Sequence, residues 1–557
     1  MLRTARFAGF LMLALIAGTV LAPTVLKAQE PSAEMPSMTI RTNTRLVVVD
    51  VVVTDKKGQP VPGLKPENFT IEESGKKQKI TTFVPPGGNQ GTTQAPPPGI
   101  MTNRPEFIKP AGVPTVLLLD ATNSPFKDQA YGRSQMLKYV LQQLQSGKPM
   151  AVVTLTDQLQ VLQNFTTDPQ ILAQAIKNLH PEQPILQAGT APPQSSGANS
   201  SDSSPAAAGM IAIAQAEIAG FANLQVGYNL ERRTVITIQA LRDLSRMLSG
   251  FSGRKNVVWL TADFPFDLIP TDRNYSDEEL SADLPNIQQK SVGTIATGAL
   301  ASQQRLLHGE EIKEAQAELA SAGIAIYPVD LRGIMTSGID VNTTFALREL
   351  AAETGGRAYV NQNEIKDGIA LAVADESASY TIGYYPENKK WDGKFRHLKV
   401  KLDRGDTELR YRKGYFAVDP TLDKNWKPEQ EVAGALQVGT PATQVSFMAQ
   451  AKPTDPGKIK VIFLVDAHTL TAEDAKGGKK MNVSIYASIF GPNGKNLGTR
   501  SIKVDRTFDA ATYQQILEKG MMVPVDVDVP AGGSQLRLAV LDNKTGLIGT
   551  VSGPLGQ

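Results

Sequence analysis

The sequence predicts an α/β doubly wound domain, flanked by short β-rich segments and followed by a β-sandwich domain. Between about residues 112 and 376, apolar runs alternate with segments of helical periodicity, as in a mainly parallel sheet with helices on both faces. The segments 40–86 and 378–417 hold only short runs rich in β-branched residues. From residue 430 to residue 557, closely spaced strands with turn signals predict an immunoglobulin-like sandwich.

Within the α/β region, short apolar runs mark the strands, and those at 116–119 and 150–156 look buried on both faces. We expect them at Thr115–Leu119, Met150–Thr156, Leu159–Phe165, Asn256–Leu260, Ile324–Val329 and Ala358–Asn361. Apolar residues at helical spacing predict helices at Asp128–Gln145, Pro169–Leu179, Met210–Leu224, Arg232–Leu248, Gln303–Ala322, Phe345–Thr354 and Glu364–Asp375. Insertions interrupt the pattern near 181–230 and 264–300. The segment 210–224 is apolar on most of its circumference, so we expect the domain or a partner to cover it.

The flanking segments are each too small to bury a core alone. Strands are expected at Thr44–Val53, Phe69–Glu72, Gln78–Phe83, Tyr380–Tyr385, His397–Asp403 and Leu409–Phe416. Because a domain's termini often lie close together, we expect 40–86 to pair with 378–417 in one sandwich. Val49, Val51 and Val53 would share its inner face. Residues 85–114 have the composition of a linker.

The loop after the first α/β strand is the candidate functional element. The strand in VPTVLLLDATNSPF ends on Asp120, and Thr122 and Ser124 follow at alternate positions. Open α/β sheets bind ligands at the carboxyl ends of their strands. One carboxylate and two hydroxyls there could bind a hard divalent cation and leave a position for a partner's carboxylate. The alternative is that Asp120 only caps the next helix.

Several segments in the same order resemble a bacterial, acidobacterial-type family related to the von Willebrand factor A domain. They are TRLVVVDVVVTDKKGQPVPGLKPENFTIEESGKKQKI, DATNSPF, FTTDPQ, SGRKNVVWL, LAAETGGRAYVNQNEI, SYTIGYYPENKKWDGKFRHLKVKL and YRKGYFA, and they cover roughly residues 40–417. The resemblance implies a von Willebrand factor A domain in an exported protein. It also implies that a threonine and an aspartate from two further loops complete a Mg²⁺ or Ca²⁺ site. Thr234 and Asp263 are the nearest matches, although Ala262 occupies the expected aspartate position.

The amino terminus predicts export. Arg3 and Arg6 precede an apolar run, and the small residue Ala28 suits a cleavage site, so residues 1–28 are expected to be a signal peptide. An uncleaved membrane anchor is the alternative, because residues 7–26 are nearly long enough to span a bilayer. The protein is then expected in the periplasm, the cell envelope or outside the cell.

Composition removes several classes of function. The chain of 557 residues contains no cysteine, which excludes disulfides, thiol catalysis and cysteine-ligated metal sites. A formal net charge of +2 gives no general attraction to nucleic acid. The four histidines lie at no ligand-like spacing, and no serine-hydrolase elbow, phosphate loop or His-Glu-x-x-His helix occurs.

The leading hypothesis is an exported, non-enzymatic adhesion or scaffold protein that binds a protein ligand through a metal-dependent A domain. The runner-up is a metal-free structural protein of the envelope whose β-domains make the contacts. An extracytoplasmic hydrolase is the third hypothesis, with no motif in its favour.

Overall fold

The computed structural model describes residues 46–87, 96–108, 112–144, 148–182, 184–185, 205–266, 299–333, 341–419 and 427–555. The expected signal peptide lies outside these ranges, as do residues 186–204 and 267–298 of the two expected insertions. In the described part of the chain, no helix has both the length and the apolar character needed to cross a membrane.

The central sheet has five strands in the order β10-β9-β6-β7-β8. Their bounds are Thr115–Asp120 (β6), Met150–Leu155 (β7), Leu159–Thr166 (β8), Lys255–Thr261 (β9) and Ile324–Asp330 (β10). Neighbouring strands are parallel except for β8, which runs antiparallel to β7. Every residue of β6, β7, β9 and β10 is buried, as expected for parallel strands covered on both faces.

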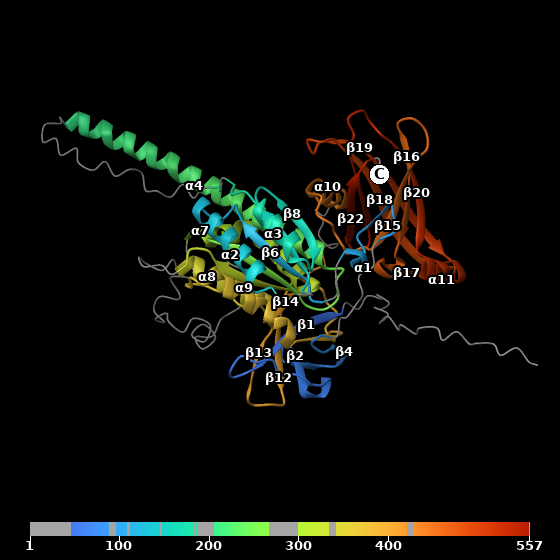
Figure 1. Ribbon diagram of the computed structural model, residues 1–557, viewed down its shortest axis with the longest axis horizontal. Helices are drawn as coiled ribbons and strands as arrows, with labels where there is room; N and C mark the ends of the chain where they lie inside the picture. Colours follow the sequence, from blue (N-terminus) through green and yellow to red (C-terminus); the bar gives the residue numbers. More distant parts are fainter. Residues whose placement is uncertain are drawn as a thin grey trace, which may run out of the picture. The chain divides into compact units, whose positions relative to one another are not determined.

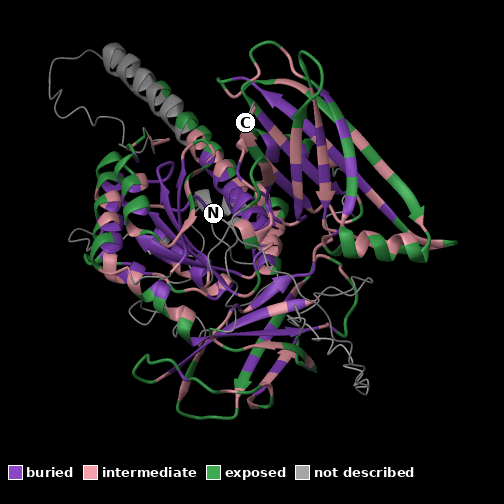
Figure 2. Ribbon diagram, turned by 45° about the vertical axis from the view of Figure 1, so that its right-hand side comes forward, coloured by how far each residue is buried: buried purple, intermediate pink, exposed green. Residues whose placement is uncertain are grey.

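Helices cover both faces of this sheet (Figure 1). One face carries α4 (Pro205–Leu248), α7 (Ala299–Ala322) and α8 (Val341–Thr354), which form a core with Val116 and Leu118. The other face carries α2 (Phe126–Gln142), α3 (Pro169–Lys177) and α9 (Ile365–Ala374), which form a core with Leu117 and Leu119. Successive residues of one strand therefore serve opposite cores, and Figure 2 shows the sheet as buried. The predicted doubly wound α/β architecture is confirmed.

Some local predictions in this domain were wrong. The helices expected at 210–224 and 232–248 are one continuous helix, α4, because the short segment between them contains no proline. The expected strand 358–361 forms only a single bridge between Tyr359 and Val329, and Asn361 then turns the chain with a φ of 58°. Leu224 is 75% exposed, and most other side chains of the segment 210–224 lie outside the described residues, so the expected cover of this segment stays a prediction.

The two flanking segments pair with each other in two antiparallel sheets of order β13-β1-β11-β4 and β14-β12-β2-β3. The strands are Val47–Asp55 (β1), Phe69–Glu73 (β2), Lys76–Gln78 (β3), Ile80–Val84 (β4), Ser379–Tyr384 (β11), Phe395–Leu402 (β12), Thr407–Arg410 (β13) and Gly414–Phe416 (β14). Val49 lies opposite Ile382, and Ile71 lies opposite Val400. These residues share one core with Val51 and Val53, so each segment covers the apolar face of the other.

Two of the strands expected in these segments are divided in the structure. The expected strand 78–83 becomes β3 and β4, and the expected strand 409–416 becomes β13 and β14. In each case the first piece pairs in one sheet and the second piece pairs in the other. The chain therefore crosses between the two layers at a point that its local composition does not mark.

The C-terminal domain is a two-sheet sandwich around one large core. One sheet has the order β20-β16-β15-β5; the other has the order β17-β18-β21-β22, with β19 also paired to β18. The strands are Phe447–Pro453 (β15), Lys458–Val465 (β16), Ala472–Ala475 (β17), Gly478–Phe490 (β18), Asn496–Phe508 (β19), Met521–Asp528 (β20), Gln535–Asp542 (β21) and Ile548–Pro554 (β22). The sequence predicts seven strands here, at Val445–Ala449, Lys460–Val465, Asn482–Phe490, Gly498–Val504, Val523–Val529, Gln535–Leu541 and Leu547–Val551. This prediction missed β17 and the helices α10 (Pro428–Val438) and α11 (Ala510–Lys519).

Part of the expected linker 85–114 belongs to this sandwich. Ile100–Thr102 (β5) pairs with β15, and a short helix, Pro105–Ile108 (α1), follows. The buried amide of Asn103 donates to the carbonyl oxygens of Ala442 and Val445, at 2.6 and 2.8 Å. The interpretation of the whole segment as a linker was therefore wrong, because three residues of a proline-rich stretch complete the edge of a distant sheet.

Candidate functional site

The predicted loop lies at the carboxyl edge of the central sheet, between the end of β6 and the start of α2. The backbone N–H groups of Ala121 and Thr122 donate to the carbonyl oxygen of Leu155, the last residue of β7. The buried amide of Gln129 donates to the carbonyl oxygens of Ala121 and Ser124, at 3.0 and 2.9 Å. The neighbouring strand and the first turn of α2 therefore fix the loop from both sides.

Asp120 is fully buried at the end of β6. Its Oδ1 accepts from the backbone N–H of Asn123 at 2.9 Å, and its Oδ2 accepts from Asn123 Nδ2 at 2.8 Å. The same Oδ2 accepts from the indole N–H of Trp259 at 2.9 Å and from the hydroxyl of Thr261 at 3.1 Å. Burial raises the pKa of Asp120 above its ordinary value, against the opposing effect of these neutral donors. Asp120 therefore anchors its own loop to β9 and does not cap α2, which begins at Phe126.

Thr122 and Ser124 are also buried, and they bind backbone groups of the adjacent strand ends. The Thr122 hydroxyl donates to the carbonyl oxygens of Leu155 and Thr156. The Ser124 hydroxyl accepts from the N–H of Ala262, which follows β9, at 3.0 Å. The two hydroxyls therefore join the ends of three neighbouring strands.

Arg233 of α4 connects the loop to Asp263. Its Nε donates to Asn123 Oδ1 at 2.7 Å, and its Nη2 donates to Asp263 Oδ2 at 2.6 Å. The Arg233 side chain is 3% exposed and that of Asp263 is 19% exposed, so the ion pair is largely buried. The other Asp263 oxygen, Oδ1, accepts from the Thr343 hydroxyl at 2.7 Å. Asp263 thus belongs to the same network as Asp120.

Thr234, the remaining predicted ligand, lies outside this network. Its hydroxyl donates at 2.9 Å to the carbonyl oxygen of Leu230, one turn earlier in α4. Sequence reasoning missed Asn123, Trp259, Thr261 and Arg233, which make the contacts that hold the edge together. Asn123 could have been identified from the sequence, because it lies between the two predicted hydroxyl ligands. Nothing in the spacing of Arg233 indicates its role.

As arranged, these residues do not fit a divalent cation. Such an ion needs several oxygen atoms whose lone pairs converge on one point. The Asp120 carboxylate instead accepts four hydrogen bonds. The oxygens Asn123 Oδ1 and Asp263 Oδ2 accept hydrogen bonds from the Arg233 guanidinium. Within the described ranges, no group of three or more acidic or histidine side chains could hold a metal ion.

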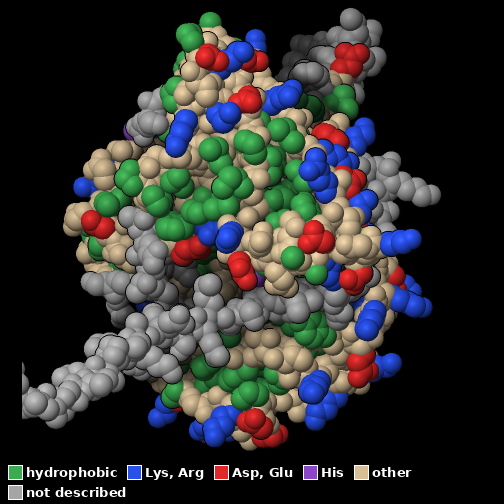
Figure 3. Space-filling model, turned by 90° about the vertical axis from the view of Figure 1, so that its right-hand side faces the viewer, with side chains coloured by type: hydrophobic (Ala, Val, Ile, Leu, Met, Phe, Trp, Pro, Cys, Tyr) green, Lys and Arg blue, Asp and Glu red, His purple; other side chains and the backbone are tan. Residues whose placement is uncertain are grey.

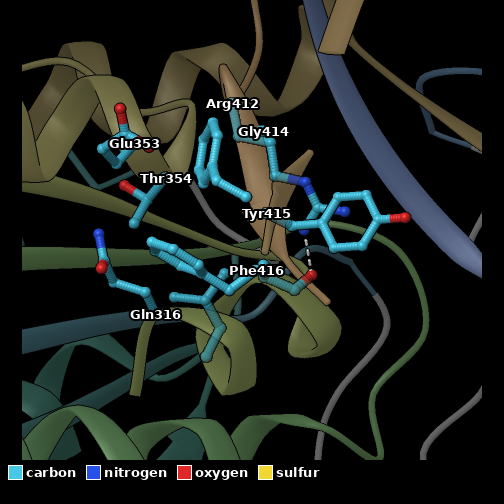
Figure 4. A pocket seen from close by; sticks show the side chains of 10 residues that line it. Gln316, Glu353, Thr354, Arg412, Gly414, Tyr415 and Phe416 are labelled. Carbon is cyan, nitrogen blue, oxygen red and sulfur yellow. Dashed lines mark hydrogen bonds between the residues drawn. The ribbon is translucent and has the colours of Figure 1, made fainter. Parts of the chain in front are cut away.

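A small cavity lies between α7, the end of α8 and the strand β14 (Figure 4). Its volume is about 20 Å³, which is room for about one water molecule. The buried Arg412 lines it, donates to the carbonyl oxygens of Ala320 and Val48, and has no partner for its Nε. Burial lowers the pKa of Arg412. A cavity of this size is too small for an organic substrate.

The outer face of the sheet β20-β16-β15-β5 carries a contiguous apolar surface. Inward and outward residues alternate along these strands, and Gln450, opposite Ile462, is one of the polar outward residues. The apolar outward residues are named here the apolar sheet face: Met522 and Pro524, which are exposed, and Met448, Ile462 and Leu464, which are half-buried. The strand register places Leu464 between Met448 and Met522, and Ile462 beside Pro524. Met522 is 68% exposed. Figure 3 shows hydrophobic side chains gathered on this side of the molecule.

No protein-family model matches the chain, and no curated protein matches it. Among solved structures, an aerotolerance-related membrane protein from Bacteroides fragilis is 10% identical with a TM-score of 0.25, and the match covers 47% of this chain and 98% of that chain. A von Willebrand factor type A protein from Catenulispora acidiphila is 10% identical with a TM-score of 0.20, and the match covers 89% and 73%.

The pilus adhesin SpaC from Lactobacillus rhamnosus GG is 8% identical with a TM-score of 0.23, and the match covers 90% of this chain and 62% of that chain. TM-scores this low assign neither a fold nor a function. The assignment of the α/β domain therefore rests on its own strand order, pairing and two-sided helical cover.

Proposed function

We propose that this chain is an exported, non-enzymatic scaffold or adhesion protein that binds another protein through the apolar sheet face of its C-terminal sandwich. The contiguity of that face carries the proposal. Five apolar side chains on three adjacent strands are turned away from the core of their own domain. Larger exposed apolar patches on soluble proteins are typically interaction sites.

The edge of the apolar sheet face has the character of an interface rim. Lys460 and Asp526 lie directly opposite each other on β16 and β20, with 3.6 Å between Nζ and Oδ1, and both are well exposed. An apolar centre with a polar rim is the usual organisation of a protein–protein interface. Methionine at two of the five positions suits a surface that adapts to its partner.

A second candidate surface is the carboxyl edge of the α/β domain, and Phe126 favours it. This side chain is 60% exposed and directly follows the fixed loop 120–125. An aromatic residue on a rigid support is a common anchor in protein interfaces. This second surface corresponds to binding through the A domain, but without a metal ion.

The chemistry of the carboxyl edge supports a non-enzymatic role. A general acid or base must come within hydrogen-bond distance of its substrate. Asp120 is fully buried with both oxygens occupied, and Asp263 is paired with Arg233. Neither carboxylate is placed to exchange a proton with a substrate arriving from solvent. The hydrolase hypothesis therefore gains no support from these two carboxylates.

Site-specific photo-crosslinking in a native envelope extract tests the proposal. A crosslinking residue at Met522 should capture a specific protein, and the same residue at Phe126 tests the second surface. Leu371 on α9, which is 49% exposed, provides a matched control on another part of the chain. Equal capture from Leu371 and Met522 would contradict binding at the apolar sheet face. Specific capture from Phe126 alone would move the function to the carboxyl edge, and a chelator should then have no effect.

A further inference from the structure

We propose that the Arg233 guanidinium is a permanent cation at the carboxyl edge and takes the place of a divalent metal ion between the loops after β6 and β9. The predicted metal ligands come mainly from two loops, one after β6 and one after β9. Arg233 bonds to both of these loops, to Asn123 at 2.7 Å and to Asp263 at 2.6 Å. A positive charge therefore already joins the elements that an ion would join.

Burial makes this arrangement stable as it stands. A guanidinium that is 3% exposed requires a partner charge, and Asp263 supplies one. The planar fork of an arginine forms two directed hydrogen bonds, which a spherical ion would not do. The opposite side of Asn123 donates to Asp120 and to the Thr237 hydroxyl, so the amide orients Arg233 against the loop.

Electrostatics oppose a second cation at the same place. A divalent ion bound by Asp120 and Asp263 would lie close to the guanidinium, in a largely buried setting where like charges repel strongly. It would also have to displace the indole and hydroxyl donors from Asp120 Oδ2. The geometry therefore points to an edge that works without a metal ion, wherever the protein partner binds.

The test measures the melting temperature of the full chain with millimolar Mg²⁺, Ca²⁺ or Mn²⁺, against NaCl of equal ionic strength. The native protein should show no saturable shift. Arg233→Met removes the charge but keeps most of the apolar stem, so it should leave Asp263 without this cation and produce a saturable rise with the divalent ion. Arg233→Lys restores a positive charge and should again be insensitive to metal.

Arg537→Met is the control. The Arg537 side chain donates to the carbonyl oxygens of Leu436 and Gln437, at 2.6 and 2.7 Å, and to the amide oxygen of Gln535 at 3.1 Å. These acceptors are neutral, so this variant should not respond to metal. A saturable rise in the native protein that Asp120→Asn abolishes would overturn the proposal. Absence of any metal response in a folded Arg233→Met protein would also overturn it, because the guanidinium would then not occupy a cation position.

Direct Mn²⁺ binding, followed by electron paramagnetic resonance, decides the matter if Arg233→Met does not fold. In that case only the native protein is titrated. Free Mn²⁺ at all protein concentrations supports the proposal, and stoichiometric bound Mn²⁺ contradicts it.

Discussion

The carboxyl edge of the central sheet and the apolar sheet face of the C-terminal sandwich differ in what their side chains leave available. At the carboxyl edge, polar groups are buried and bonded to one another, and Asp120 alone accepts four hydrogen bonds. At the apolar sheet face, the outward side chains of β20 remain exposed, with Met522 at 68%. A cluster of polar residues at a sheet edge is therefore not by itself a binding site, because its donors and acceptors can all be used in hydrogen bonds within the protein.

The largest effect is expected from Asp120→Ala. It leaves the Trp259 indole and the backbone N–H of Asn123 without this acceptor in a buried position, while the Thr261 hydroxyl and the Asn123 amide keep second acceptors on Asp263 and Thr237. The free energy of unfolding of the α/β domain should fall by about 3–5 kcal/mol. Urea denaturation of the full chain, followed by tryptophan fluorescence, measures the change. Asp157→Ala, at an exposed position after β7, should change it by less than about 0.5 kcal/mol. An equally small loss from Asp120→Ala would show that the network does not stabilise the edge.

An effect of intermediate size, the dependence of unfolding free energy on pH, is expected from Asp243, near the C-terminal end of α4. Burial raises its pKa from 3.8 to about 6, against the lowering influence of Arg246, Gln239 and Arg242. Because the folded protein holds this proton more tightly than the unfolded chain, the stabilising contribution is complete below about pH 4. This contribution is lost as the pH rises through about 6, so the free energy of unfolding falls by about 2–3 kcal/mol.

Asp243→Asn removes this titration, so the difference in unfolding free energy between native protein and variant should change between about pH 4 and pH 6. Asp157→Asn should change nothing in the same window, since that side chain is exposed. A pH-independent difference for Asp243→Asn would mean that Arg246 keeps the carboxylate ionised throughout.

The smallest effect on stability is expected at the apolar sheet face, where adjacent residues provide a matched pair. Met522 points outward and Val523 points into the core of the sandwich. Met522→Gln should change the free energy of unfolding by less than about 0.5 kcal/mol, whereas Val523→Gln should cost several times more. Thermal denaturation of the two variants makes the comparison. If Met522→Gln destabilised the domain as much as Val523→Gln, the face would be part of a core and not a surface for a partner.

Much of the architecture was predictable because burial has a local periodicity. The continuous apolar run 116–119 predicts a strand covered on both faces, and its alternate residues do serve two separate cores. Val49, Val51 and Val53 occupy every second position of one strand, and all three lie in one core with Ile382 and Val400 from the other flanking segment. The position of the candidate loop also followed from the sequence, since strands of a parallel sheet end at a common edge.

The tertiary structure decided which groups these elements meet. Asn123 and Arg233 are 110 residues apart in the chain, and Trp259 lies 139 residues beyond Asp120, yet these contacts determine what the loop can bind. Likewise, residues 100–102 have a linker's composition but complete a sheet with β15, more than 340 residues later. The periodicity of apolar residues predicts whether a side chain is buried, because burial depends on which face of its own helix or strand the residue lies on. The identity of its partner depends on how distant elements pack, and no short stretch of sequence contains that information.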